Sequence, residues 1–170
     1  HAWDRMWTVP RPCPDLPSGP MPMSRSDPAL SADVEPAALT ARIQAALNDA
    51  RRLQAVHDSR LLDSPPEAVF DSLTALAASL LGVPTAFVSV MAADRDFYKS
   101  QHGFCGELAE TRELSGRTFC HHTLLRDAPL VIEDTLLDPV FAAVPTVPPL
   151  RVRAYKSVQL KRKERIINSI

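Results

Sequence analysis

Six of the sixteen prolines lie between Pro10 and Pro22, and they limit where this chain can fold. Proline fixes φ and has no backbone N–H, so neither a helix nor a sheet can be built through such a stretch. We therefore expect residues 1–35 to form a disordered, proline-rich N-terminal segment. The rest of the 170-residue chain has the length of one domain, since domains typically span roughly 100–200 residues.

Composition and charge exclude several functional classes. The formal net charge of −1 argues against nucleic-acid binding by the whole chain. No stretch approaches the roughly 18 consecutive apolar residues of a membrane span, so we expect no membrane partner. Cys13, Cys105 and Cys120 are too few and too scattered for a disulfide framework, which indicates a reducing cytoplasm. The chain begins with His1, so we expect a fragment or a start upstream of the natural one.

Apolar residues at three- and four-residue spacing predict an amphipathic linker helix over residues 36–58. Its stripe consists of Leu39, Ile43, Ala46, Leu47, Ala50 and Leu53. The stripe is narrow and resembles a coiled-coil seam, although it lasts for only a few heptads. Packing on its own domain and a homodimer through residues 36–57 are both open.

Residues 59–155 have the pattern of an α+β domain. Ser64 and Glu67 predict a capping box for a helix that ends at Gly82. The next elements that we expect are a buried strand over 85–93, a returning strand over 97–102, a loop over 103–116, a short helix over 118–125, a strand over 129–134, a proline-broken connection over 137–149 and a strand over 150–155. This order predicts helices packed on an antiparallel sheet.

Residues 156–170 form a basic, atypical tail. The tail carries five basic residues and one acidic residue, has no alanine, and contains three of the five isoleucines. Glycine, the usual residue of tight hairpins, is absent after Gly116. We interpret the tail as foreign or out-of-frame sequence, and a solvated basic helix is the alternative.

Short motifs in a fixed order carry a resemblance to a known family. They are Arg60-Leu61-Leu62-Asp63-Ser64-Pro65-Pro66-Glu67, Phe70-Asp71, Gly82-Val83-Pro84, Asp94-Arg95 with Phe97-Tyr98-Lys99-Ser100 and Gly103, Phe119-Cys120-His121-His122, Asp134-Thr135-Leu136-Leu137-Asp138-Pro139-Val140-Phe141, and Val152-Arg153-Ala154-Tyr155. Together they cover about residues 50–155. In this order and spacing they resemble the GAF domains of bacterial signalling proteins.

The resemblance implies a GAF-like antiparallel sheet with helices packed on one face. It also implies a non-catalytic module that senses a small molecule and reports to an effector domain, such as a kinase, cyclase or phosphatase, outside this chain. Val140 replaces the family's usual arginine, and Lys156-Ser157 stand where a small residue and glycine are usual. The family's last strands and closing helix have no counterpart in the sequence, so we expect a C-terminally truncated domain.

The resemblance also places a small-molecule cavity on the helix-free face of the sheet. We expect no cofactor and no catalytic residue. Each candidate binding residue also has a plain interpretation as core or turn. The candidates are the apolar walls Phe97, Phe119 and Phe141, the polar residues Lys99, His122, Asp134 and Asp138, and Cys120, which lines or supports the pocket.

Two other functions stay open. One is a truncated fragment that has no function or only dimerises. The other is a thiol or zinc sensor built on His102, Cys105, Cys120 and His122, although residues two apart on a helix point about 200° apart, which disfavours a shared ion. We interpret Asp94 and Asp96 as capping acceptors in a turn.

Overall fold

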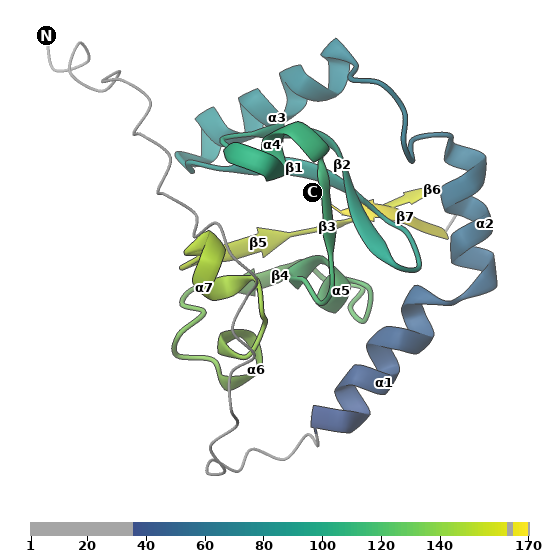
Figure 1. Cartoon of the computed structure of the whole chain (residues 1–170), viewed down its shortest axis with the longest axis vertical. Coiled ribbons are helices and arrows are strands. Elements are labelled where there is room, and N and C mark those ends of the chain that lie inside the picture. The colour runs from purple at the N-terminus through teal and green to yellow at the C-terminus, as the bar shows by residue number, and fades with distance from the viewer. Residues whose placement is uncertain (1–35, 163–164, 170) are drawn as a thin grey trace, which may run out of the picture.

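The computed structural model describes residues 36–162 and 165–169, so the expectation for residues 1–35 lies outside it (Figure 1). The helices are α1 (Pro36–Leu47), α2 (Ala50–Ser59), α3 (Ala68–Leu81), α4 (Gly106–Thr111), α5 (Phe119–Thr123), α6 (Pro139–Ala142) and α7 (Val147–Leu150). The strands are β1 (Ala86–Met91), β2 (Arg95–His102), β3 (Glu113–Ser115), β4 (Leu130–Ile132), β5 (Tyr155–Ser157), β6 (Gln159–Arg162) and β7 (Arg165–Ser169).

A five-stranded sheet with the order β3-β2-β1-β7-β6 forms the centre of the fold. Its neighbouring strands are antiparallel, and β4 and β5 form a separate antiparallel pair. The β1–β2 register shifts between Val88 and Ser89, which leaves Lys99 without a partner in the ladder. The α+β architecture with an antiparallel sheet is confirmed.

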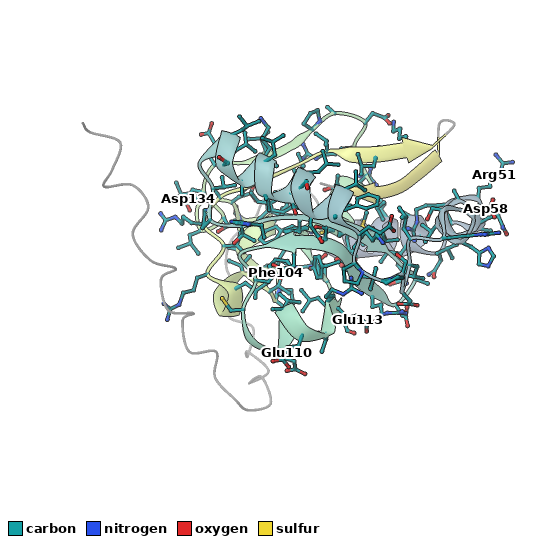
Figure 2. All side chains as sticks on the ribbon, turned by 90° about the horizontal axis from the view of Figure 1, so that it is seen from above. Arg51, Asp58, Phe104, Glu110, Glu113 and Asp134 are labelled. Carbon is teal, nitrogen blue, oxygen red and sulfur yellow. The ribbon has the colours of Figure 1, made fainter. Side chains whose placement is uncertain are left out.

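Helices cover both faces of the sheet. Val90 of β1 packs with Phe97 of β2 and Val56 of α2, on the side where α3 also lies. The alternate residue Met91 packs with Cys120 of α5 on the other side. Figure 2 shows α3 on one side of the central strands and α4 on the other. The resemblance implied helices on one face, and α1 and α5 cover the second face in addition.

The predicted linker helix over residues 36–58 is two helices that meet at Asn48 and Asp49. The Asp49 carboxylate accepts a hydrogen bond from the backbone N–H of Arg52 at 2.7 Å and caps α2. Ile43 and Leu47 of α1 are buried in the cluster that holds Met91. The stripe therefore packs on its own domain, while a homodimer through residues 36–57 stays a prediction.

Arg52 is buried at this junction although it does not belong to the apolar stripe of the helix. Its guanidinium donates to the carbonyl oxygens of Ala46 and Leu47 at the end of α1, and to those of Met91 and Ala92 at the end of β1. One cation thus satisfies four backbone acceptors where two elements end. Burial lowers the pKa of this guanidinium from its ordinary value.

The start of α3 differs from the prediction, whereas its end agrees. Glu67 is the N-cap residue and makes no side-chain capping hydrogen bond, so the predicted capping box is wrong. Ser64 instead donates to the Leu61 carbonyl and accepts from Lys99. Gly82 ends the helix at φ +63°, a left-handed conformation that glycine adopts without strain.

The outer face of α3 is strongly apolar. Its exposed large side chains are Val69, Leu73, Leu76, Leu80 and Leu81, which are 49–76% exposed. The only charged residue of the helix, Asp71, accepts a hydrogen bond from Ser100 of β2. Apolar residues spaced four and three apart usually pack against another element. No part of the described chain covers this face.

Short elements in the middle of the chain were mispredicted. The expected loop over 103–116 contains α4 and β3, and the proline-broken connection over 137–149 contains α6 and most of α7. The strand expected over 150–155 lies further along, as β5. These elements are three to six residues long, so tertiary contacts rather than local pattern decide them.

The described part of the basic, atypical tail pairs with strands of the domain, while its interpretation as foreign or out-of-frame sequence stays a prediction. Lys156 pairs with Val131 of β4, and Ser169 of β7 pairs with Ser89 of β1 in the main sheet. The described residues of the tail form β6 and β7, so the alternative of a helical tail is wrong, whereas the truncation of the domain stays a prediction. Backbone hydrogen bonding to an open strand edge does not need glycine or a particular composition, which is why the sequence pattern misled.

Candidate functional site

Helix α5 supplies neighbouring side chains that point in different directions. Cys120 is 2% exposed and faces β1, where the Ser89 hydroxyl donates to its sulfur at 3.4 Å. His122 is 4% exposed, and its ring centroid lies 5.0 Å from that of Phe141 in α6. The two side chains thus diverge, as the helical spacing of their positions predicts.

A buried polar network joins α5 to the sheet. Asp96 is fully buried, accepts a hydrogen bond from the Thr118 hydroxyl, and lies 3.1 Å from Nε2 of His121. The backbone N–H of Thr118 donates to Nδ1 of the same histidine. Since Nδ1 accepts, Nε2 carries the proton and donates to the carboxylate.

Asp96 lies inside β2, so its interpretation as a capping acceptor in a turn is wrong. Its neighbour Asp94 does lie in the turn between β1 and β2, next to Arg95. A polar residue in a short strand between charged neighbours gives no sequence signal of complete burial. Thr118 and His121 were likewise missed as its partners.

A cavity of about 370 Å³ opens between α1, α5 and α6. In Figure 1, α6 and α1 lie below α5, to its left and right. That volume lies within the usual range for small-molecule sites, roughly 300–1,000 Å³. The lining residues are the apolar Leu39, Leu125, Val140 and Phe141 and the polar Arg42, His122, Arg126 and Asp138. Three of the predicted binding residues, His122, Asp138 and Phe141, therefore meet in it.

His122 is the most unusual of these groups. Its Nε2 atom is buried and has no hydrogen-bond partner among the described residues. Burial, followed by the positive charges of nearby basic residues including Arg117 and Arg126, lowers the pKa of His122 to about 4. The imidazole is therefore neutral at pH 7, with one unsatisfied nitrogen at the cavity.

Phe119 and Cys120 lie beside this cavity rather than in its lining. Phe119 stacks against Phe141 at 6.1 Å and against Tyr155 at 4.8 Å between ring centroids. Cys120 packs with Met91 in the cluster under α1. Both side chains pack in buried clusters beneath α5 and do not line the cavity. Cys120 therefore supports the cavity, which is one of the two roles that the sequence left open for it.

Phe97, Lys99 and Asp134 are not part of the cavity. Phe97 packs under α2, and Lys99 is completely buried, where its ammonium group donates to the Pro65 carbonyl and pairs with Glu67. Asp134 accepts from Arg153 and lies, as Figure 2 shows, at the end of the molecule opposite α2. Lys99 was mispredicted because the sequence does not reveal the register shift between β1 and β2.

Aromatic rings fill the sheet face where the resemblance places a cavity. Phe87 and Tyr98 lie 5.2 Å apart between ring centroids, and Tyr98 and Phe104 lie 4.8 Å apart in an edge-to-face pair. Burial raises the pKa of the Tyr98 phenol well above its ordinary value. The cavity at His122 lies beyond this layer, on the outer side of α5.

A second cavity, of about 530 Å³, lies between α2 and the turn that joins β1 to β2. None of the predicted binding residues lines it. Of its basic residues His57, Arg60 and Arg95, the last is paired with Asp63 at 2.5 Å and with Glu113 at 3.2 Å. The cavity at His122 is the stronger candidate, because three of the predicted binding residues line it and none lines the other.

Metal ligation finds little support in residues 36–162 and 165–169. No group of three or more His, Cys, Asp or Glu side chains in these ranges is arranged to hold an ion. Cys105 is disulfide-bonded, which differs from the expectation of reduced cysteines and removes it as a thiolate ligand. Cys120 has a free thiol that faces the sheet.

We predict that the Cys120 thiol is unreactive in the folded protein. Burial, followed by the charge of Asp96, raises the pKa of Cys120 to about 12, so almost no thiolate exists at pH 8. Alkylation measured by peptide mass spectrometry should be about a thousandfold slower in the native chain than in urea. Equal rates in the two states would favour the thiol-sensor alternative.

We also predict that His122 makes stability depend on pH. Its folded pKa of about 4 lies below the value near 6.5 of an unfolded histidine, so the unfolded state binds more protons between these values. Stability should fall by on the order of 2 kcal/mol as the pH drops from 6.5 to 4. Urea unfolding at each pH measures this, and His122→Gln should flatten the profile.

The matched control for that experiment is His57→Gln, which changes a histidine whose side chain is 86% exposed. Its profile should follow that of the wild type. If His122→Gln and His57→Gln both retain the wild-type slope, the loss of stability comes from carboxylates and the neutral state of His122 is disproved.

Comparison with solved structures finds several that resemble this chain. The GAF domain of a phosphoenolpyruvate-protein phosphotransferase from Coxiella burnetii has a TM-score of 0.50 and 12% identity, covering 73% of this chain and 76% of that chain. An Acinetobacter GAF domain from a phosphoenolpyruvate-protein phosphotransferase gives 0.48 and 12%, covering 70% and 72%. Free methionine-R-sulfoxide reductase from Neisseria meningitidis gives 0.45 and 16%, covering 83% and 75%.

The chain therefore has a GAF-like α+β fold, as its motifs predict. No protein-family model matches the sequence, and no curated protein does. At these identities the likeness concerns the fold alone. In the described ranges, none of the helices combines the length and the apolar character needed to cross a bilayer.

Proposed function

We propose that this chain is a small-molecule-sensing regulatory module of a bacterial signal-transduction protein and performs no chemistry itself. The observation that carries the proposal is the cavity lined by four apolar residues and by His122, whose buried Nε2 atom has no partner among the described residues. Mostly apolar walls with a few polar groups are typical of ligand sites. The effector that such a module would regulate lies outside this chain.

The position of α1 in the cavity wall suggests how binding would be reported. Leu39 and Arg42 line the cavity from α1, and Asp138 and Phe141 line it from α6. A ligand that touches both helices favours the arrangement in which they lie together. Arg52 ties the end of α1 to β1, so the change would reach the α1–α2 junction and the sheet. The segment that precedes α1 would receive it.

A thermal-unfolding screen tests the sensing role. The chain is melted with cyclic nucleotides and a panel of small metabolites, and at least one compound should raise Tm in a concentration-dependent way. At about 100 times Kd a ligand adds about 2.7 kcal/mol to stability. For a chain of this size that corresponds to roughly 5–10 °C.

A pair of valine variants locates the binding. Val140→Trp fills the cavity from α6 and should abolish the shift, whereas Val131→Trp on β4 should retain it, since Val131 is 56% exposed and lies outside the lining. A panel without any hit, or a shift that survives Val140→Trp, would overturn the proposal. Conversion of a bound compound into a product would contradict the non-catalytic role.

A further inference from the structure

The charged groups around the cavity at His122 are unevenly balanced. Arg42 of α1 and Arg126, which follows α5, both line it, and neither makes an ion pair within the part of the chain that the structure describes. Asp138 is the only acidic lining residue, and its carboxylate already accepts the Val140 N–H at 2.9 Å. The rim therefore carries an excess of one positive charge.

His122, which lines the cavity, carries one hydrogen-bonding atom without a partner among the described residues. Nε2 of His122 is fully buried, lacks a partner among the described residues, and belongs to a side chain that is only 4% exposed. Burying such an atom unsatisfied costs about 1–3 kcal/mol, which a ligand that supplies a partner recovers. Two unpaired cations and one unsatisfied imidazole nitrogen thus share a single recess.

The remaining walls exclude a ligand that is polar throughout. Leu39, Leu125, Val140 and Phe141 are all apolar, and the Phe141 ring lies beside the His122 ring. An apolar body packed on these walls would leave water, and its single anionic group would match the net charge of the rim. A dianion such as phosphate gains nothing from these walls and is repelled by Asp138.

We propose that the cavity binds a small organic carboxylate: the carboxylate lies between Arg42 and Arg126 and accepts a hydrogen bond from Nε2–H of His122, and its apolar body packs on Leu125 and Phe141. The proposal rests on the sensing role above and names the chemical class of its ligand. Guanidinium groups suit carboxylate binding because they pair with carboxylates in a planar, bidentate geometry.

Isothermal titration of the full chain with benzoate, benzamide and inorganic phosphate tests the ligand class. Benzoate carries the proposed charge on an apolar ring, benzamide removes the charge with little change of shape, and phosphate removes the apolar body. Benzoate should bind at least tenfold more tightly than either, and more weakly as salt increases.

Arginine variants then test the residues. Arg42→Met and Arg126→Met remove exposed charges and should each weaken benzoate binding about tenfold, whereas Arg51→Met, an exposed arginine outside the cavity, should leave it unchanged. Benzoate binding that survives both cavity variants would overturn the proposal. So would phosphate or benzamide that binds as tightly as benzoate.

The failures of the two proposals are distinguishable. If benzoate does not bind but an uncharged compound does, and Val140→Trp abolishes that binding, the carboxylate inference is wrong and the sensing role stands. If no compound of either kind binds in a Val140-dependent way, both are overturned. Binding of benzoate that depends on Arg42, Arg126 and Val140 supports both.

Discussion

Replacement of Arg52 by methionine is expected to lower the free energy of unfolding by about 4 kcal/mol. Methionine fills similar space but removes the donors to four backbone carbonyls, at Ala46, Leu47, Met91 and Ala92. These acceptors lie where α1 and β1 end, and of the four the Ala46 carbonyl also accepts from the Asp49 N–H, at 3.4 Å. Equilibrium urea unfolding, followed by circular dichroism, measures the change.

Arg51→Met is the matched control, because Arg51 is the preceding residue of α2 and projects away from the sheet (Figure 2). Its effect should stay within about 0.5 kcal/mol. A loss in Arg52→Met that is no larger than in the control would show that the four contacts do not hold the junction together.

Asp96→Asn is expected to destabilise the fold by about 3 kcal/mol, although the side chain keeps its size. The carboxylate accepts from both the Thr118 hydroxyl and Nε2–H of His121. An amide has only one acceptor oxygen, so its NH2 group must face one of these two donors, and that hydrogen bond is lost. The substitution also removes a buried negative charge that interacts with the nearby Arg52 cation. Urea unfolding at pH 7 measures the loss.

Asp94→Asn provides the comparison for this substitution, since Asp94 has a side chain that is 76% exposed in the adjoining turn. Its effect should be below 0.5 kcal/mol. In addition, the effects of Asp96→Asn and Arg52→Met should not add in the double variant, because the two buried charges interact. Full additivity would show that the coupling is absent.

Local pattern was enough to predict the longer elements of the fold. The helix that ends at Gly82 and the apolar strand β1 lie where the periodicity places them. The break between α1 and α2 could also have been read from Asn48 and Asp49, which are strong N-cap residues. The apolar stripe continues across Asn48 and Asp49, and for this reason a single helix was predicted. The tail could not be predicted, since β7 is specified by an open strand edge.

The candidate site was predicted only in part, for a physical reason. His122, Asp138 and Phe141 line one cavity. Their helices α5 and α6 each follow a strand, β3 and β4, and the order of the sequence motifs reflects this arrangement. Arg42 was missed because it lies about 80 residues from His122 along the chain, and only tertiary packing of α1 brings it there. Lys99 and Phe97 were misplaced because the sequence does not show which face of β2 is covered by α2 and the start of α3.

The bare aliphatic surface of α3 has a consequence for how the experiments are read. Val69, Leu73, Leu76 and Leu80 present a contiguous patch to water in the folded chain. Environment-sensitive dyes adsorb to such patches, so their fluorescence would be high before melting begins and would fall or change little through the transition. Far-ultraviolet circular dichroism follows the backbone instead, and reports unfolding whatever adheres to this helix.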